Sequence, residues 1–325
     1  MSSGSGNRYF DSKQLFNEPV VEQVNSHMVM SRVVPPLRTR FVSIDTRFRD
    51  DYDNYGVLGA GASFSITMPE KISKVRSMKV VQAEVPFSLN NISSSMDNCS
   101  VVVKFLGAGG AVSSQSIYTI PNGFYTLTTL QAYIAANPIP GLGALSVSGN
   151  AHASFPVSAF GVGVTGLNVV FSVDASGNFN KYGVKSTLGW LLGFRLASYN
   201  FTAGGTTWIS ESQMDLNGPR YMFLVLDDFQ NATSGDTSFI SPLYRSIINK
   251  NIIARFAAIC SIDGSGCTNN NYRYTEKTGT LVTDTRCYSG FGNLQRLQVS
   301  LVDEFGRVMD LDGLDFSFCV QLETE

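Results

Sequence analysis

The sequence is short of charge and of the residues that most catalytic and metal sites use. Charged residues make up 15% of its 325 residues, and the formal net charge is −2. A balance so close to neutral creates no overall field that would draw nucleic acid or an anionic membrane to the protein. We therefore expect no nucleic acid partner. The chain also has only two histidines and two tryptophans.

The sequence also lacks the segments that direct a chain into or across a membrane. No positively charged start is followed by an apolar run, so we expect no signal peptide and no secretion. No uninterrupted apolar run reaches the roughly eighteen residues that a transmembrane helix needs. The five cysteines show no C-x-x-C spacing, which favours reduced thiols over a disulfide framework. Cys260 and Cys267 could face each other across a hairpin, where they would bond only if oxidised.

What the sequence does have is a clear alternation of apolar and polar residues near its end. The apolar residues of one parity are Leu314, Phe316, Phe318, Val320 and Leu322. Side chains on a strand point alternately to opposite faces, so residues 314–323 predict a strand with one buried face. Residues 296–301 predict a second strand of the same kind, and the residues between the two carry turn chemistry. Each of these strands needs a partner layer to cover its apolar face.

The remainder of the chain also favours strands over helices. The expected strands are 41–45, 63–68, 75–85, 101–106, 117–120, 169–173, 221–226 and 252–259. One helix is expected after Pro121-Asn122-Gly123, with Thr126 or Thr128 as its cap. A second, short helix is expected over 186–192, ending at Gly193. Strands at this density predict an all-β sandwich or barrel.

Residues 1–38 predict an N-terminal arm. Its first residues have nothing to bury and should be mobile unless a partner orders them. Apolar anchors follow at Tyr9, Phe10, Leu15 and Phe16, at a spacing that could form a short helical face. These anchors either dock on a neighbouring subunit or pack on the arm's own domain, and the sequence leaves both readings open.

One glycine-rich stretch matches a nucleotide-binding pattern in its letters. Residues 161–166 read G-x-G-x-x-G. That pattern holds a pyrophosphate only when a helix N-terminus follows it. Here residues 167–171 predict a strand, so we interpret the stretch as a glycine-rich turn and expect no cofactor.

Carboxylates, histidines and glycosylation triplets give no stronger signal. Hard cations need several oxygens at one point, and no calcium-loop spacing is present. Asp-x-Asp-Gly between two strands is commoner as a turn, and neither histidine has a partner at triad or zinc spacing. The candidates set aside on these grounds are Asp227, Asp228, Asp310, Asp312, Asp315, His27 and His152. Without a signal peptide, we interpret the N-x-S/T triplets as chance matches; they begin at Asn91, Asn98, Asn200 and Asn231.

Six separated stretches carry motifs that belong together in one protein family. They are Phe41–Asp50, Phe64–Pro86, Ile120–Thr126, Leu188–Phe194, Leu216–Tyr221 and Leu314–Phe318. Together they resemble the single jelly-roll penton and minor capsid proteins of large double-stranded DNA viruses with icosahedral capsids. The resemblance covers most of residues 40–325 and leaves out the arm.

The resemblance implies a fold and a role. The expected fold is a single jelly-roll β-sandwich of two four-stranded antiparallel sheets over residues 39–325, with one or two short helices in insertions. The implied function is a non-enzymatic structural capsid protein, a penton forming a homopentamer at the five-fold vertices. It would sit in the virion, assembled in the host cytoplasm, beside the major capsid protein and other minor capsid proteins. Contact with an inner membrane stays open, and so does a non-vertex position in the shell.

Two hypotheses about surface residues follow. Arg38, Arg40, Arg47 and Arg49 would pair with acidic residues on neighbouring subunits, or else lie in solvated turns. A function of another class, glycan or receptor binding on a virion appendage, would need aromatic rings grouped in an exposed loop region. The rings considered for it are Trp190, Trp208, Tyr199 and Tyr288.

Overall fold

Antiparallel β-strands make up most of the regular structure, which confirms the predicted all-β class. The computed structural model describes residues 21–24, 27–30, 36–52, 61–86, 90–229, 251–257, 271–275, 277 and 279–325. Near the N-terminus, β1 (Val21–Val24) and β2 (His27–Met30) form an antiparallel hairpin. The arm's predicted anchors at Tyr9, Phe10, Leu15 and Phe16 lie outside the described residues.

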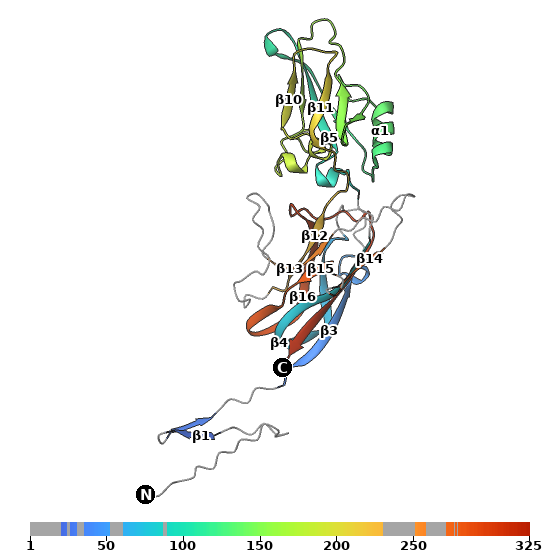
Figure 1. Ribbon diagram of the computed structural model, residues 1–325. Helices are drawn as coiled ribbons and strands as arrows, with labels where there is room; N and C mark the ends of the chain where they lie inside the picture. Colours follow the sequence, from blue (N-terminus) through green and yellow to red (C-terminus); the bar gives the residue numbers. More distant parts are fainter. Residues whose placement is uncertain are drawn as a thin grey trace.

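A jelly roll forms the body that carries the C-terminus (Figure 1). Its first wall has the order β3 (Arg38–Asp45), β17 (Ser317–Thr324), the second half of β4 (Ser63–Pro86) and β14 (Asn271–Thr275). Its second wall has the order first half of β4, β16 (Arg286–Asp303), β12 (Tyr221–Asp227), β13 (Ile252–Ala257) and the short β15 (Leu281–Thr283). Because β4 runs through both walls, the hydrogen bonds join them into one eight-stranded sheet folded over a core.

β4 joins two strands that the sequence predicted as separate, 63–68 and 75–85. Pro69 lies inside it, where a ladder hydrogen bond is normally lost. The pairing with β16 is irregular here: it passes from Thr67 to Ile72 with register shifts, so exposed Pro69 occupies a gap in the ladder. Lys74 has a φ of 58°, which bends the strand from one wall into the other. The proline therefore marks a bend in β4 and does not end it.

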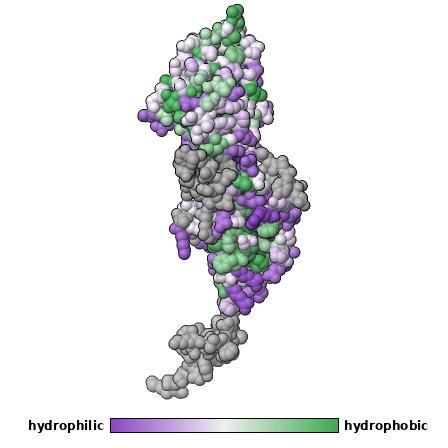
Figure 2. Space-filling view, turned by 90° about the vertical axis from the view of Figure 1, so that its right-hand side faces the viewer, coloured by the Kyte–Doolittle hydropathy of each residue, from purple (hydrophilic) through white to green (hydrophobic). Residues whose placement is uncertain are grey.

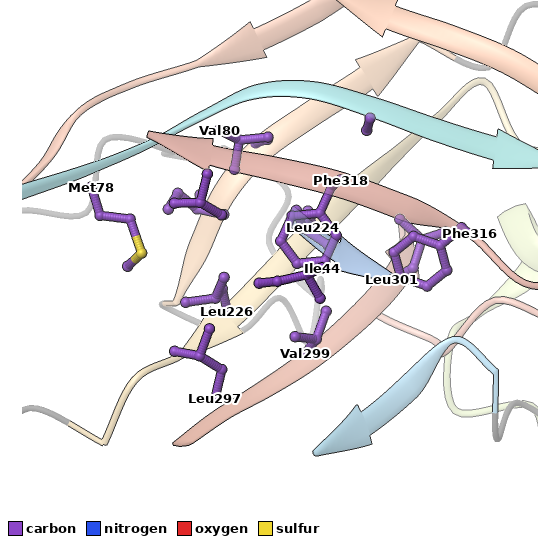
Figure 3. Packing of buried hydrophobic residues seen from close by; sticks show 14 of the residues in the cluster. Ile44, Met78, Val80, Leu224, Leu226, Leu297, Val299, Leu301, Phe316 and Phe318 are labelled. Atoms are coloured by element: carbon purple, nitrogen blue, oxygen red, sulfur yellow. The ribbon is translucent and has the colours of Figure 1, made fainter. Parts of the chain in front are cut away.

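The jelly-roll core confirms most of the predicted alternation. Ile44 and Phe318 of the first wall face Leu224, Val299 and Leu301 of the second, and all are buried (Figure 3). The prediction was wrong for Leu314, which is 38% exposed. The strand begins only at Ser317, and Leu314 closes the turn formed by Asp312 and Gly313, where no alternation applies.

Residues 90–219 form a second body, the inserted domain, between β4 and β12. One of its sheets has the order β10 (Ser198–Phe201), β9 (Gly166–Val170), β5 (Ser100–Leu106) and β6 (Val112–Thr119). The other has the order β11 (Thr207–Gln213), β8 (His152–Pro156) and β7 (Ser146–Ser148). Its hydrophobic core shares no residue with the jelly-roll core. The jelly-roll domain expected over residues 39–325 thus contains a second core.

Both predicted helices lie in the inserted domain. α1 (Leu127–Ala136) begins at Thr126, whose side chain forms a capping box with Thr129, which confirms the cap. α2 (Leu188–Leu191) is shorter than predicted, because a separate 3₁₀ turn covers Val184–Ser186. Gly193 ends it with a φ of 91°, and a Cβ there would lie 2.1 Å from the carbonyl oxygen of Ser212. No helix among the described residues is long and apolar enough to cross a bilayer.

Candidate assembly surfaces

The outward side of the first jelly-roll wall is mostly polar. On this side, Phe41 of β3 lies opposite Gln321 of β17, and Ser43 of β3 lies opposite Cys319 of β17. Side-chain hydrogen bonds tie neighbouring strands together, among them Ser77 to Glu323 at 2.7 Å and Ser317 to Glu84 at 3.4 Å. We call this side of β3, β17 and β4 the outer wall face. Its small polar residues give a surface on which another protein wall could lie.

Phe41 is the exception on the outer wall face. Its side chain is 66% exposed, and Leu37, just before β3, is 49% exposed. β3 is also the edge strand of this wall, paired only with β17 among the described strands. An edge strand with an exposed aromatic ring is where a neighbouring subunit would gain most from covering the surface. The sequence placed Phe41 in a strand but gave no sign of its exposure.

Arg47 lies on the surface and is paired within its own chain. Its guanidinium donates three hydrogen bonds to the carboxylate of Asp45, the shortest at 2.6 Å. That hydrogen bond lowers the pKa of Asp45 below its ordinary value. Arg40 contacts Glu70 at 3.7 Å, with both side chains largely exposed. The predicted pairing of these arginines with neighbouring subunits stays a prediction. To pair with a neighbour, each arginine would have to share or give up the carboxylate that it contacts now.

Arg49 is different, because its side chain is only 4% exposed. Its guanidinium donates to the carbonyl oxygen of Thr46 at 2.9 Å and to the carboxylate of Asp315 at 3.1 Å. Asp315 also accepts a hydrogen bond from the Thr46 hydroxyl. These contacts tie the end of β3 to the start of β17. In the single chain, Arg49 therefore stabilises the jelly roll, and its charge is satisfied internally.

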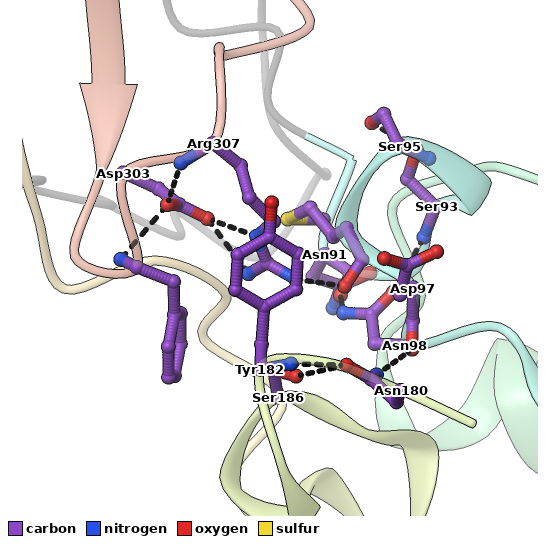
Figure 4. A network of polar contacts seen from close by, with 12 residues as sticks. Asn91, Ser93, Ser95, Asp97, Asn98, Asn180, Tyr182, Ser186, Asp303 and Arg307 are labelled. Carbon is purple, nitrogen blue, oxygen red and sulfur yellow. Dashed lines mark hydrogen bonds and ion pairs between the residues drawn. The ribbon is translucent and has the colours of Figure 1, made fainter. Parts of the chain in front are cut away.

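A polar junction joins the jelly roll to the inserted domain (Figure 4). Arg307, in the turn after β16, forms a buried ion pair with Asp303 at 2.7 Å. It also donates to the carbonyl oxygen of Met96 in the inserted domain and stacks 5.0 Å from the ring centre of Tyr182. Phe305 packs edge-on against Tyr182 from the same turn. One turn of the jelly roll thus contacts two segments of the inserted domain.

Glu304 lies in the same turn and is poorly solvated. One of its carboxylate oxygens is buried and has no hydrogen-bond partner among the described residues. Burial raises the pKa of Glu304 to about 7, and the adjacent Asp303 adds to the rise while Arg307 and Arg220 oppose it. The side chain therefore changes charge near neutral pH, next to the junction.

We expect Glu304 to make the protein less stable as the pH rises. Its pKa is higher in the folded state than in the unfolded chain, so the folded state binds more protons between about pH 4.5 and pH 7. The stability that this group contributes is present below that window and is lost across it. Glu304→Gln should flatten this part of the profile, measured as the urea midpoint at successive pH values. A variant whose midpoint follows the wild-type profile would contradict the assignment, and Asp312→Asn, in an exposed turn, is the control.

The aromatic residues considered for glycan binding do not form an exposed group. Trp208 is buried and stacks with Phe194 in the core of the inserted domain, at 3.9 Å between ring centres. Tyr288 is buried in the jelly roll, where it donates to Asp228. Trp190 is half-buried, and the guanidinium of Arg195 lies 4.0 Å from its ring centre. Nothing in this arrangement favours the glycan-binding hypothesis.

The other candidate sites have structural explanations. The G-x-G-x-x-G stretch is a turn that leads into β9, as predicted. The carboxylate of Asp310 accepts a hydrogen bond from the backbone N–H of Asp312 within a turn. No group of three or more His, Cys, Asp or Glu side chains able to hold a metal occurs in the described residues. Cys260 and Cys267 lie outside the described residues.

The comparisons with known proteins give only distant likenesses. No protein-family model matches the chain, and no curated protein matches it. The crystal structure of the selenomethionine-labelled mavirus penton protein is similar over 90% of this chain and 100% of its own, with a TM-score of 0.39 and 9% identity. A chain of the cryo-electron microscopy structure of the Sputnik virophage is similar over 88% of this chain and 98% of its own, with a TM-score of 0.32 and 12% identity. Likenesses this distant do not establish a family.

Proposed function

We propose that this chain is a structural capsid protein whose jelly roll packs side by side with copies of itself in a closed ring. Phe41 carries the proposal: an aromatic ring 66% exposed on the edge strand of an otherwise polar wall. Covering such a ring removes apolar surface from water, and aromatic anchors dominate the energetics of most protein interfaces. The motifs in the sequence that resemble penton and minor capsid proteins support the same role.

The geometry of a jelly roll suits a ring. Its two walls share the bent strand β4, so they form a stiff unit. A cyclic oligomer repeats one heterologous contact until it closes, with one patch meeting a different patch on the next copy. On this proposal Phe41 and Leu37 form one of the two patches. Five copies would place the ring at a five-fold vertex of an icosahedral shell, beside the major capsid protein and other minor capsid proteins of the virion.

The mass of the purified full-length chain tests the proposal. Light scattering should give five copies per particle. Phe41→Ser should reduce the ring to single copies or raise the concentration needed for it by about tenfold or more, because it removes an interface anchor. The stability of the single chain should change by less than about 0.5 kcal/mol, since the side chain is mostly exposed.

A matched control separates a contact from a general effect of removing an exposed aromatic. Phe179 is 76% exposed in the inserted domain, so Phe179→Ser should leave the ring intact. A wild-type chain that stays a single copy at all concentrations would contradict the ring. A closed particle with another number of copies would instead favour a non-vertex position in the shell.

A further inference from the structure

β6 of the inserted domain is an edge strand without the usual protection. It spans eight residues, Val112–Thr119, and contains no charged residue and no proline. Among the described strands it pairs only with β5, in a register that shifts only next to Val112. An edge of this kind presents unpaired backbone groups that can extend the sheet into another chain, and natural proteins normally block it.

The other described edges carry such protection. β3 has Arg38 and Arg40, whose charges oppose pairing. β10 and β15 are four and three residues long, and β7 is three residues long. β11 contains Glu211 and an irregular register. β14 contains Arg273, and β1 and β2 are four residues long. These edges are thus protected by charge, shortness or irregularity, whereas β6 is long, regular and neutral.

The surroundings of β6 also suit burial. Residues 105–173 contain no Asp, Glu, Lys or Arg, so β6 and the segments that follow it bring no charge into a contact, and Lys104, opposite Gln115 on β5, is the adjacent charged residue. Figure 2 agrees: strongly hydrophilic residues gather on the jelly roll, whereas the visible face of the inserted domain is mostly pale or green. Two apolar side chains of β6 are half exposed, Val112 at 54% and Ile117 at 49%. They would give a partner strand apolar surface to cover.

The edge is covered by the rest of the chain only at one end. The hydroxyl of Tyr133 on α1 donates to the carbonyl oxygen of Thr119, the last residue of β6. Most residues of the strand before it, from Val112 to Ile117, are exposed. In Figure 1 the turn before β6 lies at the upper left of the inserted domain, and α1 lies at its right. The helix therefore leaves the first part of the edge accessible.

We propose that β6 pairs antiparallel with β6 of a second copy of this chain, which joins two inserted domains through one continuous sheet. A strand and its own copy match in length, and antiparallel self-pairing about a two-fold axis satisfies both edges at once. The lack of charge favours this partner in particular, because a charged side chain near the two-fold axis would lie close to the same charge on the second copy. This contact goes beyond the proposed ring, which uses the jelly roll.

The test changes the charge of the edge. Wild-type protein should double its mass as concentration rises, measured by analytical ultracentrifugation at low salt. Ser114 is exposed near the middle of β6, so Ser114→Lys and Ser114→Glu should each raise the concentration for half doubling by about tenfold or more. An equal mixture of the two variants should double again, because Lys then faces Glu. Asn150→Lys, in an exposed loop, should double like wild type.

The outcomes separate this contact from the ring. If the ring forms, the particle that pairs through β6 has the mass of five copies of the chain. If the ring does not form, it has the mass of one copy. Wild-type protein that never doubles would overturn the self-pairing, and so would a Ser114→Lys variant that doubles as readily as wild type. Unchanged circular dichroism and tryptophan fluorescence would show that the variants are folded. Restored doubling in the mixture supports pairing through this strand, since a folding defect would not be rescued.

Discussion

Asn91→Ala should destabilise the inserted domain by about 3 kcal/mol, because it leaves several buried backbone groups without partners. Asn91 is 1% exposed and lies where the chain leaves β4 for the inserted domain. Its amide donates to the carbonyl oxygens of Tyr125 at 2.7 Å and of Leu216 at 2.6 Å, and its oxygen accepts from the backbone of Tyr125 at 2.7 Å. One side chain therefore holds the entry and the exit of the domain together.

Tryptophan fluorescence measures this effect selectively. The chain has only two tryptophans, and both Trp190 and Trp208 belong to the inserted domain. The urea transition followed by their emission should move to a lower concentration in Asn91→Ala. Asn200 also begins an N-x-T triplet, but it is exposed and its side chain accepts a hydrogen bond from Asn168, so Asn200→Ala should shift the transition little. Equal shifts in the two variants would contradict the role of Asn91.

Alternation in the sequence predicted the last two long strands, β16 and β17, well, because each has one face on a core. Phe316, Phe318, Val320 and Leu322 are buried as their parity required. Capping chemistry likewise located α1, since the signal at Thr126 or Thr128 is local, and the structure shows Thr126 as the cap. Such features depend on neighbours close in sequence, and sequence patterns report those directly.

Features that depend on distant residues could not be predicted in the same way. Arg47 and Arg49 are two residues apart and looked equivalent, yet one is exposed and the other is buried against Asp315, far along the chain. The partners of Asn91 lie 34 and 125 residues away. β6 alternates poorly because most of its residues are exposed, so only its last part was predicted as a strand. The inserted domain's separate core follows from which strands pair, and composition does not reveal that.

Phe318→Ala should destabilise the jelly roll by about 3–5 kcal/mol while leaving the tryptophan signal of the inserted domain nearly unchanged. Phe318 is buried near the start of β17 and stacks with Phe316 at 6.1 Å between ring centres. Removing its ring leaves a cavity between the two walls, where Leu224 and Leu301 lie opposite (Figure 3). The inserted domain has its own core, so its packing should not respond directly.

Hydrogen exchange followed by mass spectrometry can measure the two bodies separately. In Phe318→Ala, peptides from β4, β16 and β17 should exchange faster, and peptides from β5 and β9 should keep the wild-type rate. Phe194→Ala is the matched control, because Phe194 is equally buried but packs against Trp208 and Phe171 in the inserted domain. It should give the reverse pattern. If either variant accelerated exchange equally in both sets of peptides, the two cores would be one cooperative unit, and the junction at Arg307 would then have to couple them strongly.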